Sequence, residues 1–276
     1  MRALTAEEIA QVAKPEGDDL TTITVSSPPP VPPPPPPLPL PPSPPPPPPP
    51  PSPPSPPPPP TCPANPVSTV NNAIIIQNEG GSLPNGYVPN DGIGVGANSG
   101  VTIAAGLDLS FWTPAQLQAN FSISAADAAA FTPYAATVKP KVGVVRGIAG
   151  VAAQRLLSLN DGVAISQADA DTISTNVIAY FTNRTASQFQ TLAGQNFYNL
   201  PGSAQTALTD VVFNAGGLPA TSLPSGFLPA LEANNWAGVA AALQGSGNAR
   251  LQSDGNIIAA AVAGGSLPAN GSVCTP

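Results

Sequence analysis

The stretch that decides the fold is Val101-Thr-Ile-Ala-Ala-Gly-Leu-Asp-Leu109 (VTIAAGLDL). Its alternation and β-branched residues predict a short strand or hairpin. Residues an even number of positions apart share one face of a strand, so Thr102 and Asp108 point the same way. In one straight strand they would lie about 20 Å apart, and Gly106 offers the bend that could bring Asp108 back. The plain structural alternatives are a strand-surface role for Thr102 and a cap or turn role for Asp108.

A helix precedes this stretch and ends at an acidic residue. Residues 66–78 carry apolar side chains at helical spacing, and Gly80-Gly81 follows as a stop, which predicts a helix ending near Glu79. The helix macrodipole places partial negative charge at that end, so we expect the pKa of Glu79 to rise. A raised carboxyl pKa is what a glycosidase needs in its general acid. An ordinary glutamate beside a glycine stop is the structural alternative, and Glu232 is interpreted as a solvated residue of a later helix.

The remainder of the domain is predicted to be mostly helical. Residues 82–100 are rich in Gly, Asn, Pro and Asp, which predicts loops and turns. Beyond residue 112, caps and apolar spacing predict helices after Thr113-Pro114 and after Ser124, then over 141–159, from Ser166 past Tyr180, and over 203–215, 229–244 and 253–262. A small lobe with some β structure followed by a larger helical lobe is an α+β arrangement.

Proline content divides the chain into three parts. Residues 28–61 are almost all proline, which predicts an extended polyproline II linker because proline has no backbone N–H for a helix or a strand ladder. Residues 62–276 form the predicted globular domain, which is long enough to bury a core. Residues 1–27 are interpreted as a leader or a disordered acidic tail. Their Leu…Glu-Glu-Ile…Val pattern resembles bacteriocin-type leaders, with Ala13-Lys14 where the Gly-Gly cleavage point would stand.

The charged residues exclude several classes of function. The formal charge is −7, and the domain's six basic and ten acidic residues give −4 of it. Six scattered cations make no stripe that could track phosphates, so nucleic acid is not an expected partner. The chain has no histidine, which removes Ser/His/Asp and Cys/His triads and His-based metal sites. We therefore expect chemistry that depends on carboxylates, hydroxyls or a thiol, with no metal and no cofactor.

The two cysteines lie at the two edges of the domain. Because chain ends are often close in space, we expect Cys62 and Cys274 to form a disulfide, with a pair of buried free thiols as the alternative. Such a bridge implies an oxidising compartment and export to the periplasm or the cell exterior. No run of 18 apolar residues exists that would span a membrane.

Three motifs in order resemble the pesticin-like toxin domain, whose fold is that of T-even phage lysozymes. They are Asn78-Glu-Gly-Gly, then Gly86-Tyr-Val-Pro, then the Ser-Gly-Val-Thr-Ile…Gly-Leu-Asp-Leu stretch that ends at Leu109. The helical segments 201–216 and 235–237 also resemble that family. The resemblance therefore implies a lysozyme-like fold over most of residues 70–255.

The resemblance also implies roles for individual residues. Glu79 would be the general acid at the bond between N-acetylmuramic acid and N-acetylglucosamine. Asp108 would act as base or stabilise the oxocarbenium-like transition state, and Thr102 would hold the attacking water. Arg250 falls near the place where this fold has an arginine facing the acid. Tyr87, Phe111 and Trp112 are candidates for the sugar groove, and core packing is the preferred interpretation of Phe111.

The resulting hypothesis is an exported, monomeric muramidase whose partner is the glycan strand of peptidoglycan. The main alternative is a non-catalytic module that binds peptidoglycan or the cell envelope and keeps the lysozyme fold. A third interpretation is a structural wall protein in which the proline rod is the active part. An immunity protein is a further partner that the sequence leaves open.

Overall fold

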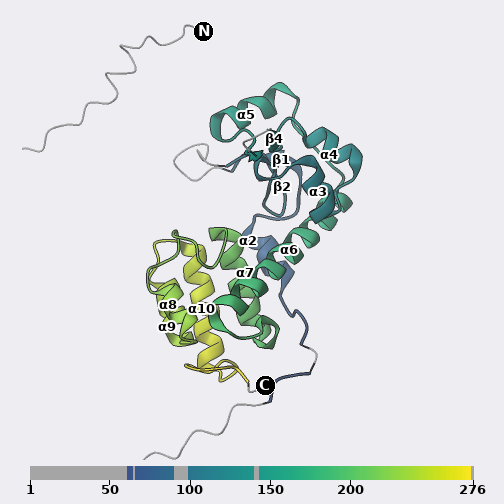
Figure 1. Cartoon of the computed structure of the whole chain (residues 1–276). Helices are drawn as coiled ribbons and strands as arrows, with labels where there is room; N and C mark the ends of the chain where they lie inside the picture. Colours follow the sequence, from purple (N-terminus) through teal and green to yellow (C-terminus); the bar gives the residue numbers. More distant parts are fainter. Residues whose placement is uncertain (1–60, 65, 90–98, 140–142, 275–276) are drawn as a thin grey trace, which may run out of the picture. The chain divides into compact units, whose positions relative to one another are not determined.

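The computed structural model describes residues 61–64, 66–89, 99–139 and 143–274 (Figure 1). The chain separates into two units, Met1–Ser55 and Pro56–Pro276, and all described residues belong to the second. The predicted leader or tail and nearly all of the predicted proline linker lie outside the described residues.

The N-terminal lobe combines small sheets with short helices. The first described helix, α2 (Asn72–Asn78), precedes the three-stranded antiparallel sheet of this lobe, which has the order β1 (Leu83–Tyr87), β2 (Thr102–Ala104), β3 (Leu107–Asp108). A 3-10 turn, η1 (Leu109–Phe111), leads into α3 (Pro114–Phe121) and α4 (Ala125–Phe131). The strands β4 (Thr137–Lys139) and β5 (Gly143–Val145) form a separate hairpin before α5 (Gly150–Leu159).

Helices make up the C-terminal lobe. They are α6 (Gln167–Ala193), α7 (Gly202–Ala215), α8 (Phe227–Glu232), α9 (Trp236–Gln244) and α10 (Ala249–Ala263), with the 3-10 turn η2 (Phe197–Asn199) between α6 and α7. Trp236 is fully buried in this lobe and stacks on Phe189 of α6, with ring centroids 5.9 Å apart.

The long helix α6 connects two separate apolar cores. Its first half contributes Ile173 and Val177 to a core built with the sheet, α3, α4 and α5. Its second half contributes Phe189 and Ala193 to the core among α7, α8, α9 and α10. In Figure 1, α6 accordingly runs from the sheet lobe to the helical lobe. The arrangement confirms the predicted α+β class.

Local signals placed several helix starts correctly. Thr113 and Gln116 form a capping box at the start of α3, with Pro114 at the first helical position. Ser124 caps α4 and Ser166 caps α6 through side-chain oxygens that accept backbone N–H groups. These caps satisfy N–H groups that have no partner within the helix.

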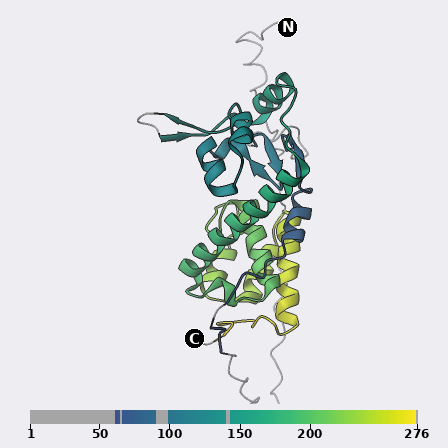
Figure 2. The same ribbon diagram turned by 90° about the vertical axis from the view of Figure 1, so that its right-hand side faces the viewer.

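Other boundaries differ from the prediction. The helix expected over 141–159 is wrong in its first part, because 143–145 form β5 and the helix begins only at Gly150. The β4–β5 hairpin extends away from the lobe and is largely exposed (Figure 2). The segment 82–100, expected to be loop, contains strand β1. The helix expected from residue 66 begins at Asn72, and the helix expected from residue 253 begins at Ala249. The single helix expected over 229–244 is divided into α8 and α9.

The predicted disulfide is present. Cys62 and Cys274 are bonded across a sequence separation of 212 residues, so the bridge closes nearly the whole described domain into one loop. Among the described residues, no helix is both long and apolar enough to cross a bilayer.

Candidate active site

Glu79 caps the C-terminus of α2, where the sequence predicted it. Its N–H donates to the carbonyl oxygen of Ile75, and Gly80 and Gly81 follow with positive φ, which ends the helix. The Glu79 side chain is only 14 % exposed. Burial raises the pKa of Glu79, while the charge and hydrogen bond of Arg250 lower it. The upward direction agrees with the prediction, but the largest cause is burial, which the helix-end argument did not include.

The turn of the β2–β3 hairpin lies against this acid. Gly106 has a φ of +77°, and a Cβ atom at this position would overlap the Glu79 carboxylate and the ring of Phe213. Gly106 therefore supplies both the bend predicted from the sequence and the close approach of backbone to acid. The turn of the hairpin therefore lies directly beside the Glu79 carboxylate.

Thr102 and Asp108 are brought together as the bend at Gly106 predicted. They are directly opposed partners in the β2–β3 pairing, so they are neighbours across the hairpin rather than distant points on one strand. Thr102 is 3 % exposed, and its hydroxyl donates a long 3.4 Å hydrogen bond to the carbonyl of Gly100. Its oxygen lone pairs accept no hydrogen bond from the described residues that would compete with a water.

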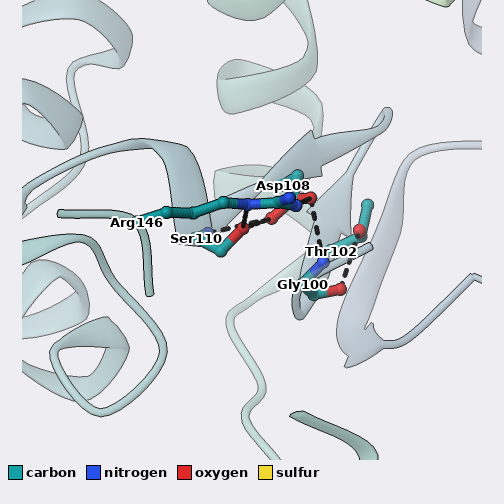
Figure 3. A network of polar contacts seen from close by, with 5 residues as sticks. All are labelled: Gly100, Thr102, Asp108, Ser110 and Arg146. Atoms are coloured by element: carbon teal, nitrogen blue, oxygen red, sulfur yellow. Dashed lines mark hydrogen bonds and ion pairs between the residues drawn. The ribbon is translucent and has the colours of Figure 1, made fainter. Parts of the chain in front are cut away.

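Asp108 accepts four hydrogen bonds, as Figure 3 shows. One carboxylate oxygen accepts from the backbone N–H of Ser110 at 2.9 Å and from the Ser110 hydroxyl at 2.6 Å. The other accepts from the N–H of Gly100 at 2.9 Å and from the Arg146 guanidinium at 3.1 Å. A carboxylate offers about four lone-pair sites, so this network fills the capacity of Asp108.

Arg146 is a site residue that the sequence interpretation missed. It follows β5 directly, donates through Nε to the Ser110 hydroxyl at 2.9 Å, and forms an ion pair with Asp108. Its guanidinium also stacks over the Phe111 ring, 3.9 Å from the centroid. Arg146 was not recognised as a site residue because residues 141–159 were interpreted as one helix. A basic residue directly after a Val-Val strand was the available signal.

Arg250 contacts the acid, as expected for an arginine facing it. One guanidinium nitrogen lies 2.5 Å from a Glu79 oxygen, and two others bind both oxygens of Asp210. Hydrogen bonds and charges of Asp210 and Glu79 raise the pKa of Arg250, even though burial acts in the opposite direction. Asp210 is fully buried, and it is a second residue that the sequence interpretation missed.

A cleft of about 550 Å³ opens beside the hairpin. It is lined by residues of the hairpin and η1, of α6, and of the end of α7: Gly106, Leu107, Asp108, Phe111, Trp112, Phe181, Arg184, Phe213, Asn214, Ala215 and Gly216. Glu79 is not among the lining residues, but Gly106, which does line the cleft, is in contact with its carboxylate. The aromatic lining has the character of a site that stacks on flat ligand faces.

The three aromatic candidates take different positions. Tyr87 is the register partner of Thr102, and its pKa is raised by burial and by the charge of Glu79, so it lies close to the acid. Trp112 lines the cleft and packs edge-to-face on Phe121 and Tyr180. The core role preferred for Phe111 is wrong, because Phe111 is 54 % exposed and lines the cleft. It stays outside because its ring stacks against the charged Arg146.

Two lobes joined by one long helix, with a buried acid ending the first helix against a β-hairpin, define a lysozyme-like domain. Comparison with protein families supports this class directly. Residues 69–237 match the Pesticin family, described as a bacterial toxin homologue of phage lysozyme, C-terminal part. The match covers more than half of the chain, and the chain belongs to this family. Membership supports a lysozyme-type muramidase in general terms. A comparison with curated proteins gives no match.

Proposed function

We propose that the domain is a peptidoglycan muramidase that hydrolyses the β-1,4 bond between N-acetylmuramic acid and N-acetylglucosamine, with Glu79 as general acid. The observation that carries the proposal is the burial of the Glu79 side chain, which is only 14 % exposed. Burial raises its pKa although an arginine lies 2.5 Å away, and a general acid must hold its proton near neutral pH. Its contact with Gly106 brings this acid to the hairpin whose next residues line the cleft.

Asp108 is proposed to stabilise positive charge on the sugar ring in the transition state. A general base needs a free lone pair for the proton of water, whereas all four acceptor sites of Asp108 are occupied. A fixed, hydrogen-bonded carboxylate is well suited to electrostatic stabilisation because it needs no reorganisation during the reaction. Thr102, its cross-strand neighbour, is proposed to position the attacking water.

The cleft residues are proposed to bind the glycan. Trp112 and Phe111 line the cleft, and aromatic side chains suit the flat faces of sugar rings. Tyr87 and Arg250 are proposed to act at the acid, one beside it and one paired with it.

We further propose that the protein is exported and acts as a monomer. The Cys62–Cys274 disulfide and the toxin homology of the family both support an oxidising compartment. In this organisation, residues 1–27 are a leader or tail, 28–61 a polyproline linker, and 62–276 the catalytic domain.

The alternative is a peptidoglycan-binding module that keeps the fold without the chemistry. The occupied acceptor sites of Asp108 are the observation that favours it. Binding and cleavage are separated by incubating the full chain with insoluble peptidoglycan and measuring sedimented protein and soluble muropeptides together. The matched variants are Glu79→Gln and Glu232→Gln, the domain's other and exposed glutamate.

The muramidase proposal expects that Glu79→Gln still sediments with the wall but releases at least about 100-fold less product, which is the usual contribution of a general acid. Glu232→Gln should match the parent. Equal sedimentation of all three proteins with no soluble product from any of them would replace the muramidase by the binding module.

A further inference from the structure

Two buried aspartates behind Arg250 have no part in the function proposed above. Asp210 of α7 is 0 % exposed and Asp254 of α10 is 1 % exposed. Buried carboxylates are costly unless they are paired or neutralised. Their position in the interior, next to the arginine that contacts Glu79, therefore calls for an explanation.

Asp210 is bound as a carboxylate. Arg250 donates to both of its oxygens, through Nε at 2.9 Å and Nη2 at 2.5 Å, and Asn78 donates to one of them at 2.9 Å. This two-pronged geometry is the strongest form of an arginine–carboxylate contact. Arg250 therefore has one negative partner deep in the interior and a second, Glu79, towards the hairpin.

The surroundings of Asp254 favour its neutral form. It follows Arg250 by four residues, which puts both side chains on one face of α10. Burial and the negative charge of Asp210 raise the pKa of Asp254 to about 9, while the charge of Arg250 opposes them. Its Oδ2 has no hydrogen-bond partner among the described residues, and a buried carboxylate oxygen without a partner is costly when it is charged. The raised pKa therefore favours the carboxylic acid at neutral pH, and that form adds no charge beside Asp210.

Glu79 is acted on by one positive and one negative group with opposite effects on its pKa. A lone arginine 2.5 Å from a glutamate would favour the ionised carboxylate, which is the wrong state for a general acid. The charged groups that act on Glu79 are Arg250, which lowers its pKa, and Asp210, which raises it. Tyr87 also faces Glu79, but it carries no charge at ordinary pH, since a tyrosine is protonated there and burial raises its pKa further.

We propose that Asp210, supported by the carboxylic acid form of Asp254, neutralises Arg250 so that Glu79 can hold its proton in the resting enzyme. Arg250 can then orient Glu79 by a hydrogen bond without imposing a net positive charge on it. Asp210 and Asp254 are positioning residues, since neither is proposed to touch the substrate. The inference rests on the proposed function of Glu79 as general acid.

The first test is the pH profile of muropeptide release by the full chain and its variants. Asp210→Asn leaves the charge of Arg250 uncompensated, so the alkaline limb of the kcat/KM profile should move to lower pH by about one pH unit. At pH values above the shifted limb, kcat/KM should be about tenfold lower than in the parent. Thr209→Val, at the neighbouring buried position of α7, is the control for packing and should leave the limb in place. Asp254→Asn keeps an uncharged side chain at this position and should also leave the alkaline limb in place.

The result that would overturn the proposal is an equal loss of activity by Asp210→Asn at every pH, with the alkaline limb unmoved. A purely structural role of Asp210 would produce that pattern.

The second test needs neither activity nor a variant that folds. Carboxyl-carbon NMR of the full parent chain should find Asp254 protonated through pH 7, titrating only well above the usual range of an aspartate. Titration of Asp254 near pH 4 would overturn the proposal. A parent chain that releases no muropeptides while Asp254 stays protonated would instead count against the muramidase function alone.

Discussion

Replacing Asp254 by asparagine should stabilise the protein, and the gain should grow with pH. In the folded state the pKa of Asp254 is raised to about 9, from 3.8 for a free aspartate. The unfolded chain therefore releases this proton at a much lower pH than the folded chain. The contribution of Asp254 to stability is full below pH 3.8 and is lost as pH rises towards 9. Asparagine cannot ionise, so it removes this loss.

The magnitude follows from proton linkage. Between about pH 5 and pH 8 the folded parent binds one proton more than the unfolded chain, so its free energy of unfolding falls by about 1.4 kcal/mol per pH unit relative to the variant. At pH 7 the accumulated difference is on the order of 4 kcal/mol. A poorly paired amide in the buried site would offset about 1–3 kcal/mol of that, but the offset does not depend on pH.

Urea unfolding of the full-length parent and Asp254→Asn, from pH 5 to pH 8, measures this difference. The two free energies of unfolding should diverge steadily as pH rises. Parallel pH dependences, whatever their separation, would refute it, because they would mean that Asp254 is ionised in the folded state. Asp161→Asn, at an exposed aspartate of the same domain, is the control and should follow the parent.

Three further predictions concern the rest of the domain. Cys62→Ser should lower the free energy of unfolding by about 5 kcal/mol on the chain-entropy model for a loop of 212 residues, as measured in urea against the oxidised parent. Arg146→Gln removes one of four donors to Asp108 and should lower kcat on peptidoglycan on the order of tenfold with little change in KM. Arg155→Gln, at an exposed position of α5, should match the parent. Because the pKa of Glu79 is raised, kcat/KM should persist above the usual glutamate range and fall on the alkaline side as Glu79 loses its proton. A profile that rises with pH through that range would contradict this.

Local chemistry explains why much of the fold was predictable. Capping residues such as Thr113 and Ser166 fix helix starts through hydrogen bonds within three residues, so the sequence pattern carries the information. The same holds for the bend at Gly106, where a positive φ and the approach of Glu79 both require glycine. Thr102, Asp108 and Glu79 could therefore be placed before the structure.

The residues that were missed depend on contacts distant in sequence. Arg146 reaches Asp108 across 38 positions and Arg250 reaches Asp210 across 40, and no local spacing indicates either pair. Residues 143–145 were expected to be helical because valine and glycine also occur in apolar helices. Here Gly147 packs against the backbone of Tyr134 and Ala135 so closely that a side chain would not fit, and that constraint is tertiary.

The central claim is that this domain cuts glycan strands as a muramidase, and the sugar at the newly formed reducing end tests it most directly. Purified peptidoglycan is digested with the full chain, reduced with borohydride, and the released fragments are identified by mass spectrometry. A muramidase should release fragments that end in reduced N-acetylmuramic acid, and Glu79→Gln should abolish their release. Fragments ending in reduced N-acetylglucosamine, or equal release by the Glu79→Gln variant, would contradict it.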